Sequence, residues 1–478
     1  MAYDNNSTRI RRELLVKLAR LYLNGALLEN IDRLPLEMRP KRYRLQHLRC
    51  CIHTERAIIK YRLMTLLGFL CEDETDEMKP LSAYAREAMA RKTQDPRLLS
   101  VIDDACSACV QSKYFVTNAC RGCMAQPCIL NCPKKAITMD QGHSKIDPEA
   151  CVNCGKCKDM CPFHAILYVP VPCEEACPVG AVTRGESGKE IIDHERCIHC
   201  GRCVQACPFG AIVEPSQVME VLGALTGTDK TVALFAPSLA AQFDGSVEKV
   251  VGALKALGFD EVVEVASGAD LTTAHEAEEL VERLEAGEAF MTTSCCPAYT
   301  GFVDRHLPEL RSQVSDTPTP LAYAAQLSAE RTPDAKRIFI SPCIAKRREV
   351  MENPQVDYTL TFEELGGLLV AKGIDVATCE SEPAAFPASG DGRGYGANGG
   401  VRDAVAHKVG DRVEIRSELI SGLGPEAIKR LKQYVAGKGE GNFVECMSCE
   451  NGCISGPAVL ANPRLSRRKL EAIVKASD

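Results

Sequence analysis

The spacing of hydrophobic residues changes three times along this chain of 478 residues. At the N-terminal end, apolar residues recur every three to four positions, as in IRRELLVKLARLYL, where Leu14, Leu18 and Leu21 share one face of a helix. ERAIIKYRLMTLLGFL and LSAYAREAMARK repeat this spacing. The pattern predicts an N-terminal helical region over residues 1–100.

Two further patterns follow. From residue 101 to residue 215 the apolar runs are as short as KAITMD and GAIV and lie among many Cys, Pro and Gly residues. This is typical of small folds in which metal clusters replace part of the hydrophobic core. From residue 216 to residue 478, β-rich runs such as TVALFAPS and KRIFISPC alternate with helical stretches such as AHEAEELVERLEAG. That alternation predicts α/β layers with parallel sheets.

Cysteine usage adds chemistry to this outline. The chain has 26 cysteines, and 16 of them lie between Cys106 and Cys207. The N-terminal sequence has no apolar secretory core and no later run is long enough for a membrane span, so we expect a cytoplasmic protein. In a reducing compartment, repeated CxxC spacing favours metal ligation over disulfides.

Charge is unevenly distributed. The net charge is −7, yet residues 1–70 carry 14 Lys and Arg against 6 Asp and Glu. This basic segment could attract an acidic protein or a nucleic acid, or it could be a solvated helical face. Because the basic residues alternate with Leu and Ile, the solvated face is the preferred interpretation, and no nucleic-acid partner is expected.

The central cysteines follow the bacterial ferredoxin pattern C-x₂-C-x₂-C-x₃-C-P. The run from Cys197 has this spacing, the run from Cys151 repeats it, the run from Cys120 has a longer middle gap, and a fourth copy is reduced to Cys173 and Cys177. In this pattern the fourth cysteine of each run ligates the other cluster of a pair. Four 4Fe–4S clusters are therefore predicted. Their expected ligand sets are Cys120, Cys123, Cys128 and Cys161; Cys132, Cys151, Cys154 and Cys157; Cys177, Cys197, Cys200 and Cys203; and Cys106, Cys109, Cys173 and Cys207.

A series of clusters implies a redox site at its end. Beyond residue 215, six cysteines lie in three motifs, TTSCCP, SPCIAK and ECMSCENGC. On chemistry alone, four of them could hold one cubane cluster in a cleft, with the remaining thiols and Lys346 free to act beside it. The adjacent pair Cys50 and Cys51 cannot easily bind one cluster together, so we interpret these two as packing residues.

In order and spacing, these three motifs resemble the signature segments of FeFe-hydrogenase catalytic subunits, and TSCCPAY with SPCIAKR is most similar to the divergent group B branch. The resemblance implies an α/β catalytic domain of two lobes with parallel sheets over residues 216–478. Before it we expect α+β ferredoxin-like cluster domains over residues 101–215 and the helical region over residues 1–100. It also implies an H-cluster, in which a 4Fe–4S cubane joins a diiron subsite with CO, cyanide and azadithiolate ligands, inserted by maturation proteins.

The resemblance assigns roles residue by residue. Cys296, Cys343 and Cys449 would ligate the cubane, and the sulfur of Cys453 would also bridge to the diiron subsite. Cys295 would donate protons, supplied along a path through Glu276, Glu279, Arg283 and Ser315. The diiron ligands would be held by Ala236, Pro237, Ser238, Lys346 and Met447. The chain departs from the family at Tyr299, where the family has Trp, and at Ser341, where it has Met.

The implied activity is the reversible conversion of two protons and two electrons into H₂, with a ferredoxin-like protein as electron carrier. Two alternatives stay open, a hydrogen sensor and a non-enzymatic iron–sulfur carrier. Cys295, Lys346 and Met447 count against a carrier, because a carrier has no use for a proton donor and a cyanide-binding lysine.

Overall fold

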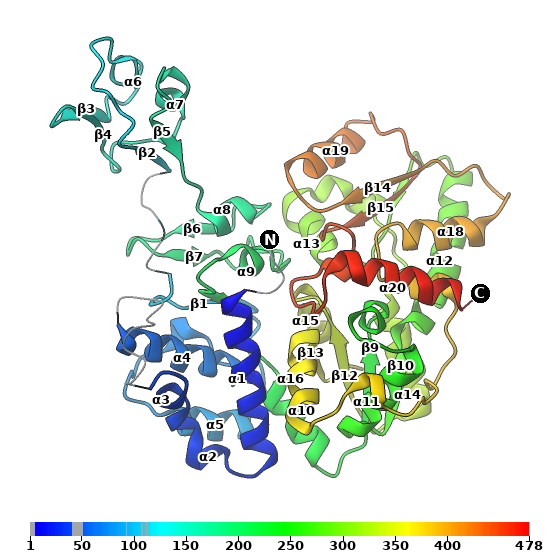
Figure 1. Ribbon diagram of the computed structural model, residues 1–478. Helices are drawn as coiled ribbons and strands as arrows, with labels where there is room; N and C mark the ends of the chain where they lie inside the picture. The colour runs from blue at the N-terminus through cyan, green and yellow to red at the C-terminus, as the bar shows by residue number, and fades with distance from the viewer. Residues whose placement is uncertain (1–4, 41–50, 92, 107–108, 110–112, 478) are drawn as a thin grey trace.

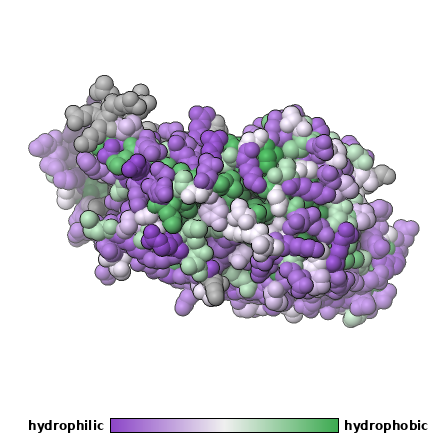
Figure 2. All heavy atoms as spheres, turned by 90° about the horizontal axis from the view of Figure 1, so that it is seen from below, coloured by the Kyte–Doolittle hydropathy of each residue, from purple (hydrophilic) through white to green (hydrophobic). Residues whose placement is uncertain are grey.

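The computed structural model describes residues 5–40, 51–91, 93–106, 109 and 113–477. Figure 1 shows the N-terminal helices beside a larger body with two sheets, and a small module that projects away from both. Within the described residues, no helix has both the length and the apolar character that a membrane crossing requires. The face seen in Figure 2 is mostly hydrophilic, with hydrophobic residues in small groups.

The N-terminal region is helical. Its elements are α1 (Asn6–Leu23), α2 (Leu27–Asn30), η1 (Ile31–Arg33), α3 (Leu34–Met38), α4 (Ile52–Leu66), η3 (Cys71–Asp73) and α5 (Leu81–Ala90). Helix α1 begins where the Asn5 side chain accepts a hydrogen bond from the amide of Thr8, a standard N-cap. Its apolar face then recurs at helical spacing and is buried at Leu14, Leu15 and Leu18.

This apolar face does not close a separate core. The buried leucines of α1 belong to the same hydrophobic cluster as Phe235 and Ile340 of the larger sheet. Helix α1 packs against α16 (Phe362–Lys372), where Gly367 allows the close approach: a β-carbon there would lie 2.9 Å from the β-carbon of Leu15. The first helix and the large body are therefore held together by one core.

The cysteine-rich segment folds into small antiparallel ribbons and single-turn helices. Strand β1 (Ser100–Val101) pairs with β8 (Ile212–Val213), so the two ends of the segment meet. The other pairs are β2 (Tyr114–Val116) with β5 (Ile166–Tyr168), β3 (Ile137–Asp140) with β4 (His143–Ile146), and β6 (Val182–Arg184) with β7 (Glu190–Ile192). The helices are α6 (Pro127–Leu130), α7 (Lys156–Met160), α8 (Pro172–Ala176) and α9 (Arg202–Ala206). We call residues 113–169 the outer module, which is the part that projects in Figure 1.

A glycine shapes the tightest contact of the cysteine loops. Gly201 has φ of 73°, in the left-handed region that other residues adopt at a cost. A β-carbon at this position would lie 2.8 Å from side-chain atoms of both Ile344 and Pro457. The loop that carries Cys200 and Cys203 can therefore lie directly against the large body.

The large body contains two parallel sheets, as the alternating pattern predicts. The first has the order β10-β9-β12-β13, and Phe339 is paired with Leu234 at its centre; the second has the order β11-β15-β14. Their strands are β9 (Thr231–Phe235), β10 (Glu261–Glu264), β12 (Lys336–Ser341), β13 (Tyr358–Thr361), β11 (Met291–Thr292), β14 (Ser417–Ser421) and β15 (Phe443–Met447).

Helices surround both sheets (Figure 1). They are α10 (Val218–Thr226), η4 (Pro237–Gln242), α11 (Val247–Leu257), α12 (Val265–Glu285), α13 (Pro297–His306), η5 (Pro308–Gln313), α14 (Pro320–Arg331), α15 (Ala345–Glu352), η6 (Val376–Thr378), α17 (Gly390–Gly394), α18 (Gly400–Val409), α19 (Pro425–Val435), η7 (Cys453–Ser455) and α20 (Pro463–Lys475). The TTSCCP motif follows β11, SPCIAK spans the end of β12, and MSCENGC spans the end of β15. All three therefore lie at carboxyl ends of parallel strands, where α/β folds place reactive groups.

Candidate active site and its cluster relay

Four thiols from the three motifs come together between the two sheets. The sulfurs of Cys296, Cys449 and Cys453 all lie close enough to Cys343 or to one another to interact electrostatically. Burial raises the pKa of Cys343 to about 12, and the charges of Cys296 and Cys453 act in the same direction. Burial likewise raises the pKa of Cys453 to about 12. A cationic iron cluster would relieve this mutual repulsion, so the donor set fits a cubane.

The geometry is not that of a mononuclear centre. In the described part of the chain, no three His, Cys, Asp or Glu side chains converge closely enough to hold a single metal ion. Four thiolates around a cubane are spread over the corners of the cluster, each binding a different iron. These are the four cysteines that the resemblance assigns to the H-cluster.

Beside these thiols, Cys295 stands at the inner end of a series of polar side chains. Burial raises the pKa of the Cys295 thiol, and the carboxyl group of Glu276 on α12 adds to the effect. Glu276 is 0% exposed, and neither of its oxygens has a hydrogen-bond partner of normal geometry. Burial raises its pKa to about 8, and the neighbouring carboxylate of Glu279 contributes. A carboxyl group in this environment can be protonated at neutral pH.

The series continues from Glu276 to the surface. The Ser315 hydroxyl donates to Glu279 Oε2 at 2.6 Å, and Thr317 Oγ1 donates to the same oxygen at 2.7 Å. Arg283, one turn along α12, lies 2.7 Å from Glu279 Oε1 and 3.2 Å from the exposed Asp316. Burial works to raise the pKa of Glu279, but these hydrogen bonds and Arg283 hold it below its ordinary value. The four path residues predicted from the sequence are thus neighbours.

Lys346 occupies the first turn of α15 and has a partner that sequence analysis missed. Its Nζ lies 2.5 Å from Glu349 Oε2, and Thr319 donates its hydroxyl proton to the other oxygen of Glu349. Burial alone would lower the pKa of Lys346, but the carboxylate of Glu349 raises it. The ammonium group is therefore charged and fixed next to Cys343. The i, i+3 spacing of the two residues was the available signal.

The segment from Ala236 to Ser238 joins β9 to η4 on the other side of the site. The Ser238 side chain is 0% exposed, and its hydroxyl has no hydrogen-bond partner in the described structure. Such a buried hydroxyl calls for a partner outside the polypeptide. Gly396, from the glycine-rich loop, packs on the backbone of Ser238, where a β-carbon would approach Ser238 N to 3.0 Å. Met447, at the end of β15, is also buried.

The departures from the family have clear local roles. Tyr299 is fully buried and donates its hydroxyl proton to Thr292 Oγ1 at 2.8 Å. Ser341 Oγ accepts the amide proton of Cys343 at 3.1 Å and so fixes the turn that presents this ligand. Cys446 lies close to Tyr299 in β15 and is 1% exposed. Sequence analysis gave Cys446 no role, because its place beside Tyr299 depends on long-range packing.

In the outer module, two small cavities gather the cysteines. One is lined by Cys120, Cys123, Cys128 and Cys161. The other is lined by Cys132, Cys151, Cys154 and Cys157. These are the two sets of four that the crossover pattern predicts, because each fourth cysteine reaches into the cavity of the other run.

The inner cysteines also form two groups. Burial raises the pKa of Cys173 to about 12, and the other charges that act on it include Cys207, Cys109 and Cys106. Burial also raises the pKa of Cys200 to about 12, with contributions from Cys197 and Cys177; the same two residues act on Cys203. A buried carboxylate not foreseen from the sequence, Glu190, adjoins the first group, and its amide donates to Cys106 Sγ at 3.4 Å.

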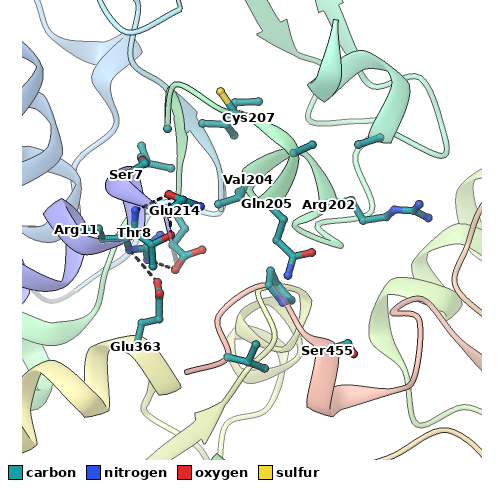
Figure 3. A pocket seen from close by; sticks show the side chains of 18 of the residues that line it. Ser7, Thr8, Arg11, Arg202, Val204, Gln205, Cys207, Glu214, Glu363 and Ser455 are labelled. Carbon is teal, nitrogen blue, oxygen red and sulfur yellow. Dashed lines mark hydrogen bonds and ion pairs between the residues drawn. The ribbon is translucent and has the colours of Figure 1, made fainter. Parts of the chain in front are cut away.

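The second inner group adjoins the four thiols of the active site. Cys200 is among the charges that act on Cys449. Both line a cavity of about 650 Å³ where α1, the cysteine loops and the C-terminal segment meet. Figure 3 shows Arg11 in this cavity, pointing to the carboxylates of Glu214 and Glu363. This buried triad ties α1 to both the cluster segment and the large body.

The predicted packing pair is only partly visible. Cys50 lies outside the described residues. Cys51 is the N-cap of α4, and its sulfur accepts a hydrogen bond from the Thr54 amide at 3.5 Å. Much of the basic surplus in residues 1–70 is also structural, since Arg11, Arg12 and Arg39 form ion pairs with buried glutamates.

Comparison with known proteins agrees with this site. Residues 229–457 match the family "Iron only hydrogenase large subunit, C-terminal domain", and residues 144–167 and 190–213 match the 4Fe–4S binding domain. Iron hydrogenase 1 of Clostridium pasteurianum is 29% identical over 386 residues, which cover 69% of this chain and 66% of that protein. The periplasmic Fe hydrogenase large subunit of Nitratidesulfovibrio vulgaris is 30% identical over 257 residues, which cover 44% of this chain and 61% of that protein.

Among solved structures, an FeFe-hydrogenase from Chlamydomonas reinhardtii aligns with a TM-score of 0.44 and 21% identity, covering 54% of this chain and 88% of that chain. The chain spans between half and two thirds of the length of the curated hydrogenases it matches. The match to the hydrogenase family covers all three cysteine motifs of the site. The chain is therefore a catalytic subunit of the FeFe-hydrogenase family, with the family domain at residues 229–457 and 4Fe–4S binding segments before it.

Proposed function

We propose that this protein is a hydrogenase that interconverts two protons, two electrons and H₂ at an H-cluster. Electrons would pass through about four accessory 4Fe–4S clusters to a ferredoxin-like carrier. The observation that carries the proposal is the polar series from Arg283 to Cys295, which ends beside four grouped thiols. A protein that only carried a cubane would need no buried proton path.

In this proposal the residues divide the work. Cys296, Cys343, Cys449 and Cys453 would hold the cubane, and maturation proteins would add the diiron subsite, which supplies the open iron where H₂ is formed or split. Lys346 and Ser238 would donate hydrogen bonds to the cyanide ligands, and Met447 would pack beside them. Because Glu349 holds Lys346 in place, the lysine needs little reorganisation to do so.

Protons would reach the site along the side chains. Arg283 and Glu279 would exchange protons with water at the surface, Ser315 would connect Glu279 to Glu276, and Glu276 would reprotonate Cys295. Glu276 suits this task because its pKa of about 8 lies near the working pH. Cys295 would deliver each proton to the bridgehead amine of the cofactor.

Energetics allows both directions. The hydrogen couple lies near about −410 mV at pH 7, since it falls by about 59 mV per pH unit. Ferredoxins of the plant type lie near about −400 mV. A ferredoxin-like carrier could therefore give electrons to this site or receive them from it.

Infrared spectroscopy of anaerobically matured protein tests the proposal, in the region where metal-bound CO and cyanide absorb. Bands that shift under H₂, together with turnover, are expected. Absence of such bands, with maturation verified on a known hydrogenase, would favour the cubane-only carrier. Bands with only slow turnover would favour the hydrogen sensor. The variant Cys295→Ser should keep the bands and lose most turnover, and undiminished activity would remove this residue from the proton path.

A further inference from the structure

The outer module exposes far more hydrophobic surface than the rest of the protein. Seventeen large hydrophobic side chains are exposed in the described structure, and eight of them lie within residues 113–169. Met124 is 99% exposed and Leu130 is 78% exposed. The eight are Phe115, Met124, Leu130, Val152, Met160, Phe163, Leu167 and Tyr168. Concentrated exposure of this kind marks an interaction surface.

These side chains lie over the predicted cluster sites. Met124 follows Cys123 directly, and Leu130 ends α6, which packs against α7. Met160 ends α7 directly before Cys161, and Phe163 lines the same cavity as Cys123 and Cys128. A partner seated on this apolar group would therefore lie directly above the cluster held by the first set of cysteines.

The charges around this surface select the partner. Residues 113–169 carry seven Lys and Arg against four Asp and Glu, although the whole chain has a net charge of −7. Five basic side chains are exposed, and none of them takes part in an ion pair within the described structure; they are Arg121, Lys134, Lys135, Lys156 and Lys158. The basic residues of α1, in contrast, are partly occupied by buried glutamates. Unpaired cations around an apolar centre complement an acidic protein surface.

A second copy of this chain is a poorer occupant. A symmetric dimer would place the same patch on both sides of its interface, so the five basic side chains would face their own copies. The outer module also projects from the body in Figure 1, which leaves room for a separate protein.

We propose that the outer module is the docking surface for a small acidic iron–sulfur electron carrier. The carrier would sit on Met124, Leu130, Met160 and Phe163 and be oriented by the surrounding lysines. One electron would leave the reduced carrier and enter the cluster bound by Cys120, Cys123, Cys128 and Cys161, with no bond made or broken; the reverse transfer would oxidise H₂. This inference rests on the proposed function and adds to it the place where electrons enter.

Two variants test the surface in the matured holoprotein. Lys134→Glu with Lys158→Glu reverses two charges, and Met124→Ser with Leu130→Ser removes the most exposed apolar side chains. The matched control, Lys432→Glu with Val435→Ser, makes the same kinds of change on exposed positions of α19. The probe is an acidic two-cluster bacterial ferredoxin, and methyl viologen serves as a small carrier that needs no docking surface. Iron content verifies that each variant keeps its clusters.

Each test variant should raise the KM for ferredoxin about tenfold, the effect of losing two surface interactions, without changing the methyl viologen rate. The charge variant should also weaken the dependence of ferredoxin binding on ionic strength. The control should resemble the wild type. Unchanged KM in both test variants, or a dimer that only these variants abolish, would overturn the proposal.

A direct binding measurement separates this inference from the proposed function. Ferredoxin affinity is measured on the same proteins by biolayer interferometry, whether or not they turn over hydrogen. If methyl viologen reveals no hydrogenase activity, the proposed function fails, while a tenfold loss of ferredoxin affinity in the variants would still support the docking surface. Equal affinity for wild type and variants would refute it independently of activity.

Discussion

Glu276 offers the sharpest test of the proton path, because its charge affects both stability and turnover. Both of its oxygens are buried without a hydrogen-bond partner of normal geometry, and its pKa is raised from 4.5 to about 8. A carboxyl group whose pKa is raised by folding takes up a proton as the chain folds. Its contribution to stability is therefore complete below about pH 4.5 and is lost as the pH rises to about 8.

The magnitude follows from the shift. Each pKa unit corresponds to about 1.4 kcal/mol, so the full shift is worth as much as about 5 kcal/mol, and about 3 kcal/mol of it falls between about pH 5.5 and about pH 7.5. For a domain of this size, that difference corresponds to about 8 °C in the unfolding midpoint. Glu276→Gln keeps the shape of the side chain and removes the titration, so this part of the pH dependence should disappear.

The assay compares the thermal unfolding of anaerobic wild type, Glu276→Gln and Glu278→Gln by circular dichroism across this pH range. Glu278 lies on the exposed face of the same helix, paired with Arg412 at 2.7 Å, and its replacement should leave the pH dependence unchanged. Turnover with methyl viologen should fall by about a hundredfold or more in Glu276→Gln only. If Glu276→Gln kept both the pH dependence of the wild type and its turnover, Glu276 would be neither a strained buried acid nor a member of the path.

Three further perturbations test other parts of the structure. Arg11→Ala leaves Glu214 and Glu363 buried without their shared cation and should cost about 3 kcal/mol in the free energy of unfolding, measured by denaturation, whereas Lys17→Ala on the exposed face of α1 should cost little. Glu349→Gln removes the counter-ion of Lys346 and should shift the cyanide infrared bands of the matured protein, while Glu352→Gln on the exposed side of α15 should not. Gly367→Ala forces α1 away from α16 and should cost about 1–3 kcal/mol, seen as faster amide exchange in α1, whereas Gly301→Ala, which meets open space, should be neutral or stabilising.

Local spacing was sufficient to predict the parallel sheets and the motifs at their edges. Strands such as β9 and β12 are short apolar runs, and the cysteine motifs follow them within a few residues. The pairing of the cysteine runs follows from the fixed crossover of the ferredoxin pattern, and the outer cavities contain the sets that this pattern gives.

Features that depend on long-range packing were not accessible in the same way. The apolar face of α1 indicates that something covers Leu14 and Leu18, but periodicity does not say what, and the partner is a sheet more than two hundred residues away. Without the family resemblance, Glu276 would be interpreted as part of a solvated helix face, because a polar residue on a buried face breaks the pattern that identifies burial. Cys446 likewise depends on the packing of Tyr299 against β15.

The pairing of β1 with β8 gives the chain a nested order. The whole cluster segment leaves the body and returns to it at adjacent strands, and within that segment the outer module leaves and returns through β2 and β5. The predicted ligand sets respect this nesting, since each cluster draws its cysteines from only one level. Insertions with adjacent ends are the ones that genes gain and lose without disturbing their hosts. An ancestor could thus have exchanged its outermost module, and with it its redox partner, while the inner clusters and the catalytic domain stayed intact.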